Sequence, residues 1–438
     1  MLTPCRAWRV AGLAVRSSIS LGLNLKNTSG STALSTESRY RVWWCLYTFE
    51  NMLGIMTGRV TYMSNGICKT PFPLPFDEEK LSDLTANKLL NNHDLHCELI
   101  ESRLACFNIR HTPLHPQGSK DASHKGHMNN PSWLKSQSAC NTLGFLYYVD
   151  LAVIVQEIVN QVYSLDCRSL VWSDVENRIG ILKSRVELWR SNLPGAYDFT
   201  KLEDQDLDLL RGKLFLGFHF YSTRIMLGRP CLCRHVSRHA DPAQKSTFSH
   251  EMVLIALESA RLMLNLIPDS PDPVWLYQNC PFWCILHYIM QSGTVLLLEL
   301  SFNCIHVPDE RESILEYSRK AVLWLLAMSH HSLASRRAWE LCDGTLRRIS
   351  RGMGYDMSAF YTPEYTETPQ QRQHQPQPSH FQGPAEFPHS QRSTFRSEAS
   401  SSEPPPPNPE FPFDPISGDL TRSFFPLIQE DNPWDGIW

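Results

Sequence analysis

The sequence lacks the residue patterns that mark the common enzyme classes and metal sites. It contains no glycine-rich phosphate loop, no Gly-x-Ser-x-Gly turn, no His-Glu-x-x-His helix and no nucleophile beside an evident base. Its 13 cysteines are scattered, and the closest pairs are Cys231 with Cys233 and Cys280 with Cys284. A structural zinc site needs four closely spaced ligands, so these pairs do not predict one. No cofactor is expected in this chain.

The sequence also has little excess charge of one sign. Its net charge is -4 over 438 residues, so it has no overall attraction to nucleic-acid phosphates. A signal peptide is not expected, because Arg6, Arg9 and Arg16 interrupt the N-terminal region. The most apolar stretch, residues 285–302, contains polar and charged side chains, which predicts a buried helix and no membrane partner. An odd number of scattered cysteines favours a reducing compartment such as the nucleus or cytosol.

No segment shows the alternating pattern of a half-buried strand, so the predicted fold class is all-α, an irregular multi-helix bundle. The chain is 42% hydrophobic with 12 tryptophans, which is enough to form a sizeable core. Apolar residues at helical spacing predict helices at 5–21, 37–60, 175–193, 207–228, 253–267, 282–302, 314–329 and 334–349. The fourth of these is expected to end at Gly228-Arg229-Pro230. Pro71, Pro73 and Pro75 predict an extended connection.

Residues 37–60 form the helix around which the rest of the chain is expected to pack. Two apolar lines follow the helical period: Val42, Leu46, Phe49, Leu53 and Met56 form one, and Trp43, Tyr47 and Glu50 form the other. A helix with two apolar faces must contact at least two neighbours, which predicts a core helix. Ser35 or Thr36 can cap its start, and Gly58 can provide the left-handed residue at its end.

A Glu, an arginine-rich turn, a Trp-Trp pair, an acidic residue and a closing Gly-Arg follow one another in this region. The residues are Arg16 in the preceding run, then Glu37, Arg39, Arg41, Trp43, Trp44, Glu50, Gly58 and Arg59. In this order and spacing they resemble the central homology region of fungal zinc-cluster transcription factors, the fungal-specific or xylanolytic-activator regulatory domain. Two positions depart from the family pattern: Asn51 stands where Arg is usual, and Val60 where Pro is usual.

The resemblance implies a division of the chain. Residues 1–110 correspond to the central part of the regulatory domain, 111–138 to a polar insertion rich in histidine, and 139–355 to its C-terminal helical half. In the family, six closely spaced cysteines hold two zinc ions and present a helix to DNA. That cluster is absent from these residues, so we expect an N-terminally truncated domain, with zinc and DNA contact only through a missing N-terminal region. Gly12, in the first helix, indicates close packing of another backbone.

Residues 356–438 differ from the rest and are predicted to be a disordered tail. From Phe360 onward they contain 15 of the 30 prolines, with many Gln and Ser. Residues 410–438 have six acidic residues against one Arg. Interleaved with these are Phe411, Phe413, Phe424, Phe425, Trp434 and Trp438. This composition is typical of an activation segment that folds on a partner groove; a plain tail, or an arm that docks back on the domain, remains an alternative.

Two functions from different classes are compatible with the sequence. The first is the regulatory and interaction region of a fungal transcription factor, regulating RNA polymerase II transcription in the nucleus. Its expected partners are transcriptional coregulators, a homodimer partner and a small-molecule inducer bound between helices. The alternative is a helical enzyme or metabolite-binding protein without a recognisable motif.

Two further features have both a structural and a functional interpretation. Cys231 and Cys233 could form a metal or redox pair, although one intervening residue is poor spacing for zinc. The densest basic helix could contact phosphate, or its side chains could simply be solvated or paired with acids. Its arginines are Arg336, Arg337, Arg347, Arg348 and Arg351.

Overall fold

The computed structural model describes residues 4–26, 32–62, 68–107, 133–164, 169–202, 206–234 and 247–354, together with residues 109 and 167. All regular secondary structure within these ranges is helical, which confirms the all-α prediction. The α-helices are α1 (Pro4–Ser20), α2 (Ala33–Thr57), α3 (Leu84–Asn91), α4 (His93–Leu99), α6 (Asn141–Val162), α7 (Trp172–Asn192), α8 (Leu207–Arg234), α9 (Thr247–Leu264), α10 (Pro273–Asn279), α11 (Ile285–Ser301), α12 (Arg311–Ser329) and α13 (Leu333–Gly352). Short 3-10 turns are η1 (Glu78–Ser82), η2 (Glu101–Arg103), η3 (Trp133–Ser136), η5 (Gly195–Tyr197) and η7 (Pro308–Glu310).

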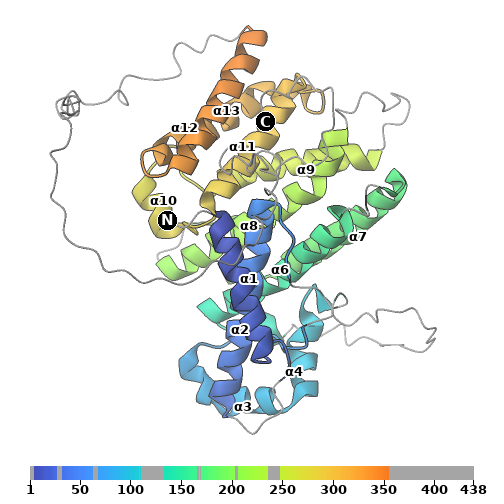
Figure 1. Ribbon diagram of the computed structural model, residues 1–438, viewed down its shortest axis with the longest axis vertical. Coiled ribbons are helices and arrows are strands. Elements are labelled where there is room, and N and C mark those ends of the chain that lie inside the picture. Colours follow the sequence, from blue (N-terminus) through green and yellow to red (C-terminus); the bar gives the residue numbers. More distant parts are fainter. Residues whose placement is uncertain are drawn as a thin grey trace, which may run out of the picture.

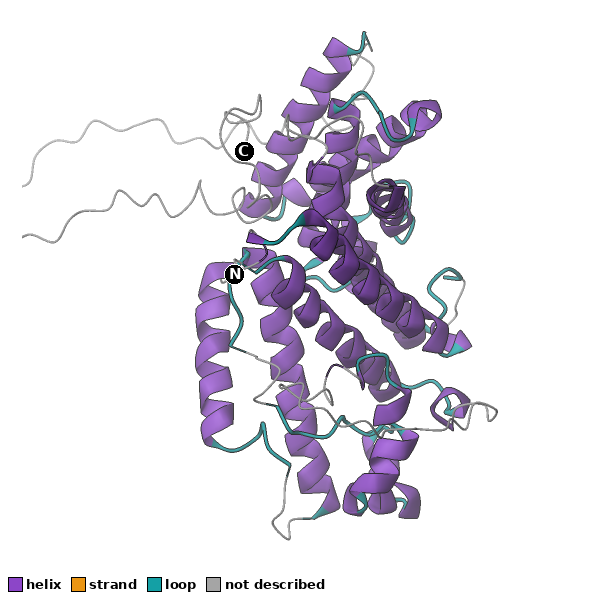
Figure 2. Cartoon of the chain, turned by 90° about the vertical axis from the view of Figure 1, so that its right-hand side faces the viewer, coloured by secondary structure: helices purple, strands orange, loops and turns teal. Residues whose placement is uncertain are grey.

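The helices are arranged in two groups joined by long central helices (Figure 1). At one end α1 packs along α2, with α3 and α4 beyond it, and at the other α9, α11, α12 and α13 pack on one another. α6 and α8 lie between these groups and contact each other. From the side, the described residues consist of helices joined by loops (Figure 2). One continuous set of buried apolar side chains runs from Val15 on α1 to Leu346 on α13. The two groups therefore share a core.

α6 is one of the deeply buried helices of this core. It is the one helix among the described residues that is long and apolar enough to cross a membrane, and 72% of that stretch is buried inside the protein. A helix that is apolar on all sides is expected wherever it is surrounded by other helices. Burial on α2, α7 and α8 accounts for its composition, as in the core of a helical domain.

α2 begins earlier than the sequence predicts. Its N-terminal cap is Thr32, whose Oγ1 accepts a hydrogen bond from the Ser35 amide at 3.3 Å, so capping by Ser35 or Thr36 was wrong. The C-terminal prediction is confirmed, because Gly58 takes a φ of 64° and its amide donates to the Gly54 carbonyl. Residues 71–74 form neither helix nor strand, and a bend follows at residues 75 and 76, so the helices are interrupted at the proline run as predicted.

The two apolar lines of α2 are not equivalent. Trp43 is 0% exposed, while Val42 and Phe49 on the other line are 49% and 39% exposed. The prediction that α2 contacts at least two neighbours is confirmed, since it packs on α1, α3 and α6, but Val42 and Phe49 are exposed. The larger rings bury more apolar area, and their indole N–H groups find partners on the same side.

α8 continues past the predicted end at Gly228-Arg229-Pro230 and reaches Arg234. Pro230 removes one backbone hydrogen bond from the helix, which α8 tolerates because it packs along almost the whole of α9. Gly228 has a packing role: a Cβ there would lie 2.3 Å from the Met252 carbonyl oxygen of α9. The Gly-Arg-Pro sequence here marks a close helix crossing and not a helix end.

Gly228→Ala should lower the free energy of unfolding by about 3 kcal/mol, because the added methyl group meets backbone atoms that cannot move aside easily. Gly344→Ala on α13 is the matched control, since a Cβ there meets nothing within 4 Å. Replacing an unhindered mid-helix glycine should raise stability by about 0.5 to 1 kcal/mol. Urea unfolding of both variants measures the difference. Equal effects would contradict the close crossing of α8 and α9.

Candidate functional site

The segment between α2 and η1 is buried without forming regular structure. We call residues 68–76 the proline segment; Thr70, Phe72 and Leu74 in it are fully buried. In the run Pro71-Phe72-Pro73-Leu74-Pro75 only two residues have a backbone N–H group, since proline has none. Buried backbone groups need partners. Side chains from α2, α4 and η2 supply them.

Each N–H of the run donates to a buried carboxylate. The Leu74 amide donates to Glu37 Oε1 at 2.9 Å, and the Phe72 amide to Glu101 Oε1 at 3.3 Å. Arg41 completes the Glu37 site by donating from Nε to the same carboxylate at 2.8 Å and from Nη2 to the Phe76 carbonyl at 2.5 Å. Burial raises the pKa of Glu37 to about 7, although the Arg41 contacts lower it. Glu37 and Arg41 therefore hold the proline segment against α2.

The Trp-Trp pair holds the same segment through its indole nitrogens. Trp43 Nε1 donates to Cys68 Sγ at 3.0 Å, and Trp44 Nε1 donates to the Pro71 carbonyl at 2.8 Å. The Trp44 ring also stacks on Phe72, with centroids 4.6 Å apart and planes 6° apart. Both tryptophans are buried. Ring packing and the N–H hydrogen bonds therefore both fix the proline segment against α2.

The last motif residues bind the turn that follows α2. Glu50 Oε1 accepts from the Tyr62 amide at 3.0 Å, and Gly58 provides the left-handed residue that starts the turn. The Arg59 guanidinium lies 5.1 Å from the Trp8 ring centroid. These contacts direct the chain back along α1.

Tyr62 then attaches this turn to α1. Its hydroxyl accepts from Arg16 Nη2 at 2.6 Å, and the same guanidinium lies 4.5 Å from the ring centroid. A Cβ on Gly12 would lie 3.1 Å from the Tyr62 ring. The close neighbour of Gly12 is thus an aromatic side chain, and the prediction of a neighbouring backbone was wrong.

Asn51, which departs from the family pattern, bridges α2 and α6. Its Nδ2 donates to Gln156 Oε1 at 2.9 Å, and Thr61 Oγ1 donates to the same oxygen at 2.9 Å. All three polar groups lie in or beside the core. The position therefore holds a neutral hydrogen-bonded bridge and no ion pair.

Three buried residues of this site were missed in the sequence. Glu101 binds the Phe72 amide, and the Nε2 of His96 lies 3.0 Å from the Phe72 carbonyl, so that nitrogen carries the hydrogen. Asp150 on α6 accepts from the amides of Ala105 and Cys106 at 3.0 and 2.8 Å. Burial raises the pKa of Asp150 to about 6. For Asp150, the signal in the sequence was a single acidic residue within the apolar stretch 143–155.

The cysteine pairs show no feature of a metal site. Within the described ranges no three histidine, cysteine, aspartate or glutamate side chains gather as metal ligands. Burial raises the pKa of Cys280 to about 12 and also raises that of Cys284 and Cys233, so these thiols stay protonated at neutral pH. Thiolates are the form that binds metal.

A family model, the fungal specific transcription factor domain, matches residues 2–191. The match covers 190 of the 438 residues of the chain. The resemblance predicted from the Trp-Trp helix is confirmed, since the match includes α1, α2 and the proline segment. Within the matched region, most residues that carried the resemblance hold the proline segment and the following turn against α1 and α2. Arg39 instead donates to the Leu21 carbonyl at 2.9 Å.

Three curated proteins are similar to the chain. A transcription regulator named galc from Aspergillus niger is 32% identical over 388 residues, which is 81% of this chain and 45% of that protein. STB5 of Candida glabrata, named a negative regulator of pleiotropic drug resistance, and protein STB5 of Saccharomyces cerevisiae are each 32% identical over 88 residues. Those 88 residues are 9% and 12% of the two proteins. The chain thus spans less than half the length of these relatives, and no solved structure matches it.

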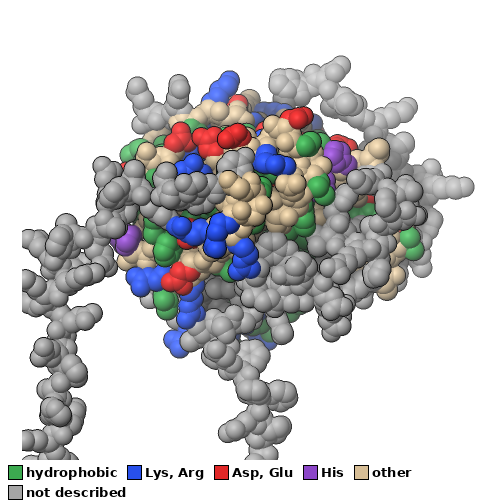
Figure 3. Space-filling view, turned by 90° about the horizontal axis from the view of Figure 1, so that it is seen from above, with side chains coloured by type: hydrophobic (Ala, Val, Ile, Leu, Met, Phe, Trp, Pro, Cys, Tyr) green, Lys and Arg blue, Asp and Glu red, His purple; other side chains and the backbone are tan. Residues whose placement is uncertain are grey.

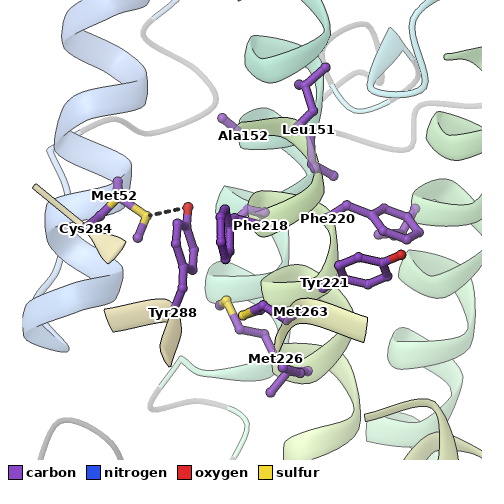
Figure 4. Close-up of a cluster of buried hydrophobic side chains, with 14 of the residues drawn as sticks. Met52, Leu151, Ala152, Phe218, Phe220, Tyr221, Met226, Met263, Cys284 and Tyr288 are labelled. Atoms are coloured by element: carbon purple, nitrogen blue, oxygen red, sulfur yellow. Dashed lines mark hydrogen bonds between the residues drawn. The ribbon is translucent and has the colours of Figure 1, made fainter. Parts of the chain in front are cut away.

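The matched region, residues 2–191, is joined to the later helices through sulfur and aromatic contacts (Figure 4). The Tyr288 hydroxyl on α11 donates to Met52 Sδ on α2 at 3.7 Å. The Tyr288 ring stacks on Phe218 of α8, with centroids 5.3 Å apart. A change in the packing of α11 would therefore alter the packing of α2, which carries Trp43 and Trp44.

Close to these rings, α8 and α11 share buried polar groups. Ser222 Oγ donates to Gln291 Oε1 at 2.7 Å. His219, one turn earlier on α8, is 2% exposed, and its ring lies 4.6 Å from the Tyr148 ring. Burial lowers the pKa of His219 from 6.5 to about 3, so the ring is neutral in the folded protein at neutral pH.

His219→Gln should make the stability of the protein less sensitive to acid. In the unfolded chain His219 takes up a proton near pH 6.5, and in the folded chain only near pH 3. The stability that neutral His219 contributes is therefore present above pH 6.5 and is lost as the pH falls. Relative to the variant, the wild type should lose about 1 kcal/mol per pH unit between pH 6.5 and 4.5. Urea unfolding at several pH values measures this, and parallel curves would contradict it.

Two predicted regions lie outside the described residues. These are most of the polar insertion at 111–138, of which only 133–138 are described, and the tail at 356–438 with all six aromatic candidates. The five arginines of the predicted basic helix all lie on α13.

Proposed function

We propose that this chain is the regulatory and interaction region of a fungal transcription factor and acts in the nucleus on transcription by RNA polymerase II. The domain match and the names of the three relatives support a regulatory role. The observation that carries the proposal is that the buried acidic side chains bind backbone amides of the chain itself. Glu37 and Glu101 hold the proline segment, and Asp150 holds the turn that follows η2. The chain is proposed to act through protein contacts and to be no enzyme.

The DNA-reading step is proposed to lie in another part of the protein. The cysteines of this chain do not have the spacing of a zinc cluster, and its net charge is -4. Coregulators, a homodimer partner and an inducer held between helices are the partners proposed for these residues.

Residues 410–438, fused to an unrelated DNA-binding module, should activate a reporter gene. Replacing Phe424, Phe425 and Trp434 by alanine should abolish the activation, because aromatic side chains supply the area buried on a partner. Replacing Asp419, Glu430 and Asp431 by their amides is the matched control and should leave most of the activity. Reporter expression in a fungal host measures all three fusions.

Two results would contradict the proposal. An inactive tail fusion would remove the activation role. A full chain that neither raises nor lowers the reporter when it is fused to the same DNA-binding module would contradict the regulatory role of the whole region.

A further inference from the structure

The outer face of α13 is arginine-rich. At 100° per residue, the five arginines fall within a sector of about 120° around the helix axis. Arg336, Arg337, Arg348 and Arg351 are exposed, and Arg347 is half-buried. The opposite side of the helix packs on α11 and α12. The arginines therefore form one stripe along the surface, about 22 Å long at 1.5 Å per residue from Arg336 to Arg351.

The acidic side chains of the helix neutralise only part of this stripe. Five arginines against Glu340 and Asp343 leave a charge of +3 on α13. Asp343 pairs with Arg347 at 2.7 Å. Arg336 and Arg348 make no ion pair with any other described residue. The stripe therefore has guanidinium groups available for a further anionic contact.

The stripe also has room for a bulky side chain. Gly344 is exposed and lies between the arginines in helical projection, and a Cβ at this position would meet nothing within 4 Å. Seen from the end of the molecule where α13 terminates, lysine and arginine side chains gather beside acidic ones (Figure 3). Guanidinium groups bind carboxylates and also stack on aromatic rings. The partner that fits such a face combines acidic and aromatic residues.

Residues 410–438 of the same chain have this composition. Six acidic residues and one Arg give them a charge of -5, and six Phe and Trp residues are interleaved with the acids. The described part of the chain ends at Gly354, two residues after α13, so 55 residues connect it to Glu410. Fully extended, 55 residues reach up to about 180 Å, which far exceeds the roughly 30 Å length of α13. The segment can therefore reach every part of the stripe.

We infer that residues 410–438 dock in cis on the arginine face of α13, with carboxylates on Arg336 and Arg348 and an aromatic ring over Gly344. Tethering raises the effective concentration of the segment at this face to the order of millimolar. The aromatic side chains cannot contact α13 and another protein at the same time. Docking on α13 therefore competes with every other partner of the tail.

The other anion that could occupy the stripe is the phosphate backbone of nucleic acid. Glu340 and Asp343 lie within or beside the stripe and repel phosphate and carboxylate alike, so charge does not distinguish the two occupants. An aromatic ring of the tethered segment can pack on the open surface at Gly344, in addition to the contacts of its carboxylates with the arginines. This aromatic contact favours the tail.

Photo-cross-linking in the full chain tests the inference. Phe424→p-benzoylphenylalanine should form cross-links to residues 333–352, and mass spectrometry identifies the joined peptides. Adding Arg336→Glu and Arg348→Glu should reduce the yield at least about fivefold, because attraction becomes repulsion at two points. Lys80→Glu and Lys88→Glu, exposed residues of η1 and α3 at the other end of the molecule, are the matched control with the same change in charge. An unchanged yield in this control and a lower yield in 500 mM salt are expected.

Three outcomes would overturn the inference. The first is a set of cross-links that avoids α13, and the second is a yield that the α13 substitutions do not lower. The third is cross-linking between copies in a mixture of isotope-labelled and unlabelled chains. If a random DNA duplex binds the full chain through Arg336 and Arg348 and cross-links avoid α13, the face belongs to nucleic acid. The reporter assay with the isolated tail is independent of this result, so docking and activation can fail separately.

Discussion

Trp43→Ala should unfold the protein or bring it close to unfolding. Trp43 is 0% exposed, and its indole nitrogen donates to Cys68 Sγ at 3.0 Å. Truncating a buried tryptophan costs about 3 to 5 kcal/mol, which is comparable to the whole stability of many domains. Circular dichroism and urea unfolding measure the loss, and reduced abundance in cells should accompany it.

Val42→Ala is the control on the same helix. Val42 is the neighbouring residue on the other apolar line and is 49% exposed, so its truncation should cost less than about 1 kcal/mol. A Trp43→Ala variant of normal stability would contradict the placement of the Trp-Trp pair in the core. Equal losses at the two positions would contradict the division of α2 into a buried and a partly exposed line.

Glu37→Ala should be the second large loss, about 3 kcal/mol or more. The substitution leaves the Leu74 amide without its acceptor and leaves the part-buried Arg41 guanidinium without its carboxylate. Removing one partner of a buried pair is costly because the other charge stays in a poorly solvated place. The free energy of unfolding measured in urea gives the loss.

Glu37→Gln separates the hydrogen bond from the charge. The amide oxygen of glutamine can still accept from Leu74, so this variant should lose much less than Glu37→Ala. Burial already raises the pKa of Glu37 to about 7, so a neutral side chain at this position is tolerated. If Glu37→Ala and Glu37→Gln were equally stable, the contact with the Leu74 amide would have no structural importance.

Most helices were predicted correctly because the apolar residues that recur at helical spacing in the sequence are buried on one side of each helix. On α7, for example, Val175, Ile179 and Trp189 lie at helical spacing and are buried as expected. The end of α8 was not predictable, because Gly228 and Pro230 have the same appearance at a helix end and at a close crossing with α9. Only the neighbouring helix distinguishes these two situations.

The candidate site was predictable on one side only. The resemblance identified Glu37, Trp43, Trp44 and Glu50, but their partners are backbone groups of the proline segment and the turn after α2. Nearly every residue has the same backbone groups, so the sequence does not show which of them will bind a side chain. A segment without a regular period also does not show which of its side chains point into the core. Glu101 was missed for the same reason, since its importance comes from the single amide that it reaches.

The most direct test of the account is amide hydrogen exchange at Phe72 and Leu74. Both amides lie in a run that forms no helix, yet each donates to a buried carboxylate, Glu101 or Glu37. Their exchange should be slower than in an unstructured peptide by at least about a hundredfold, as for a core helix and unlike a surface loop. Exchange at the unstructured rate in the otherwise folded protein would show that the motif residues of α2 do not hold the proline segment.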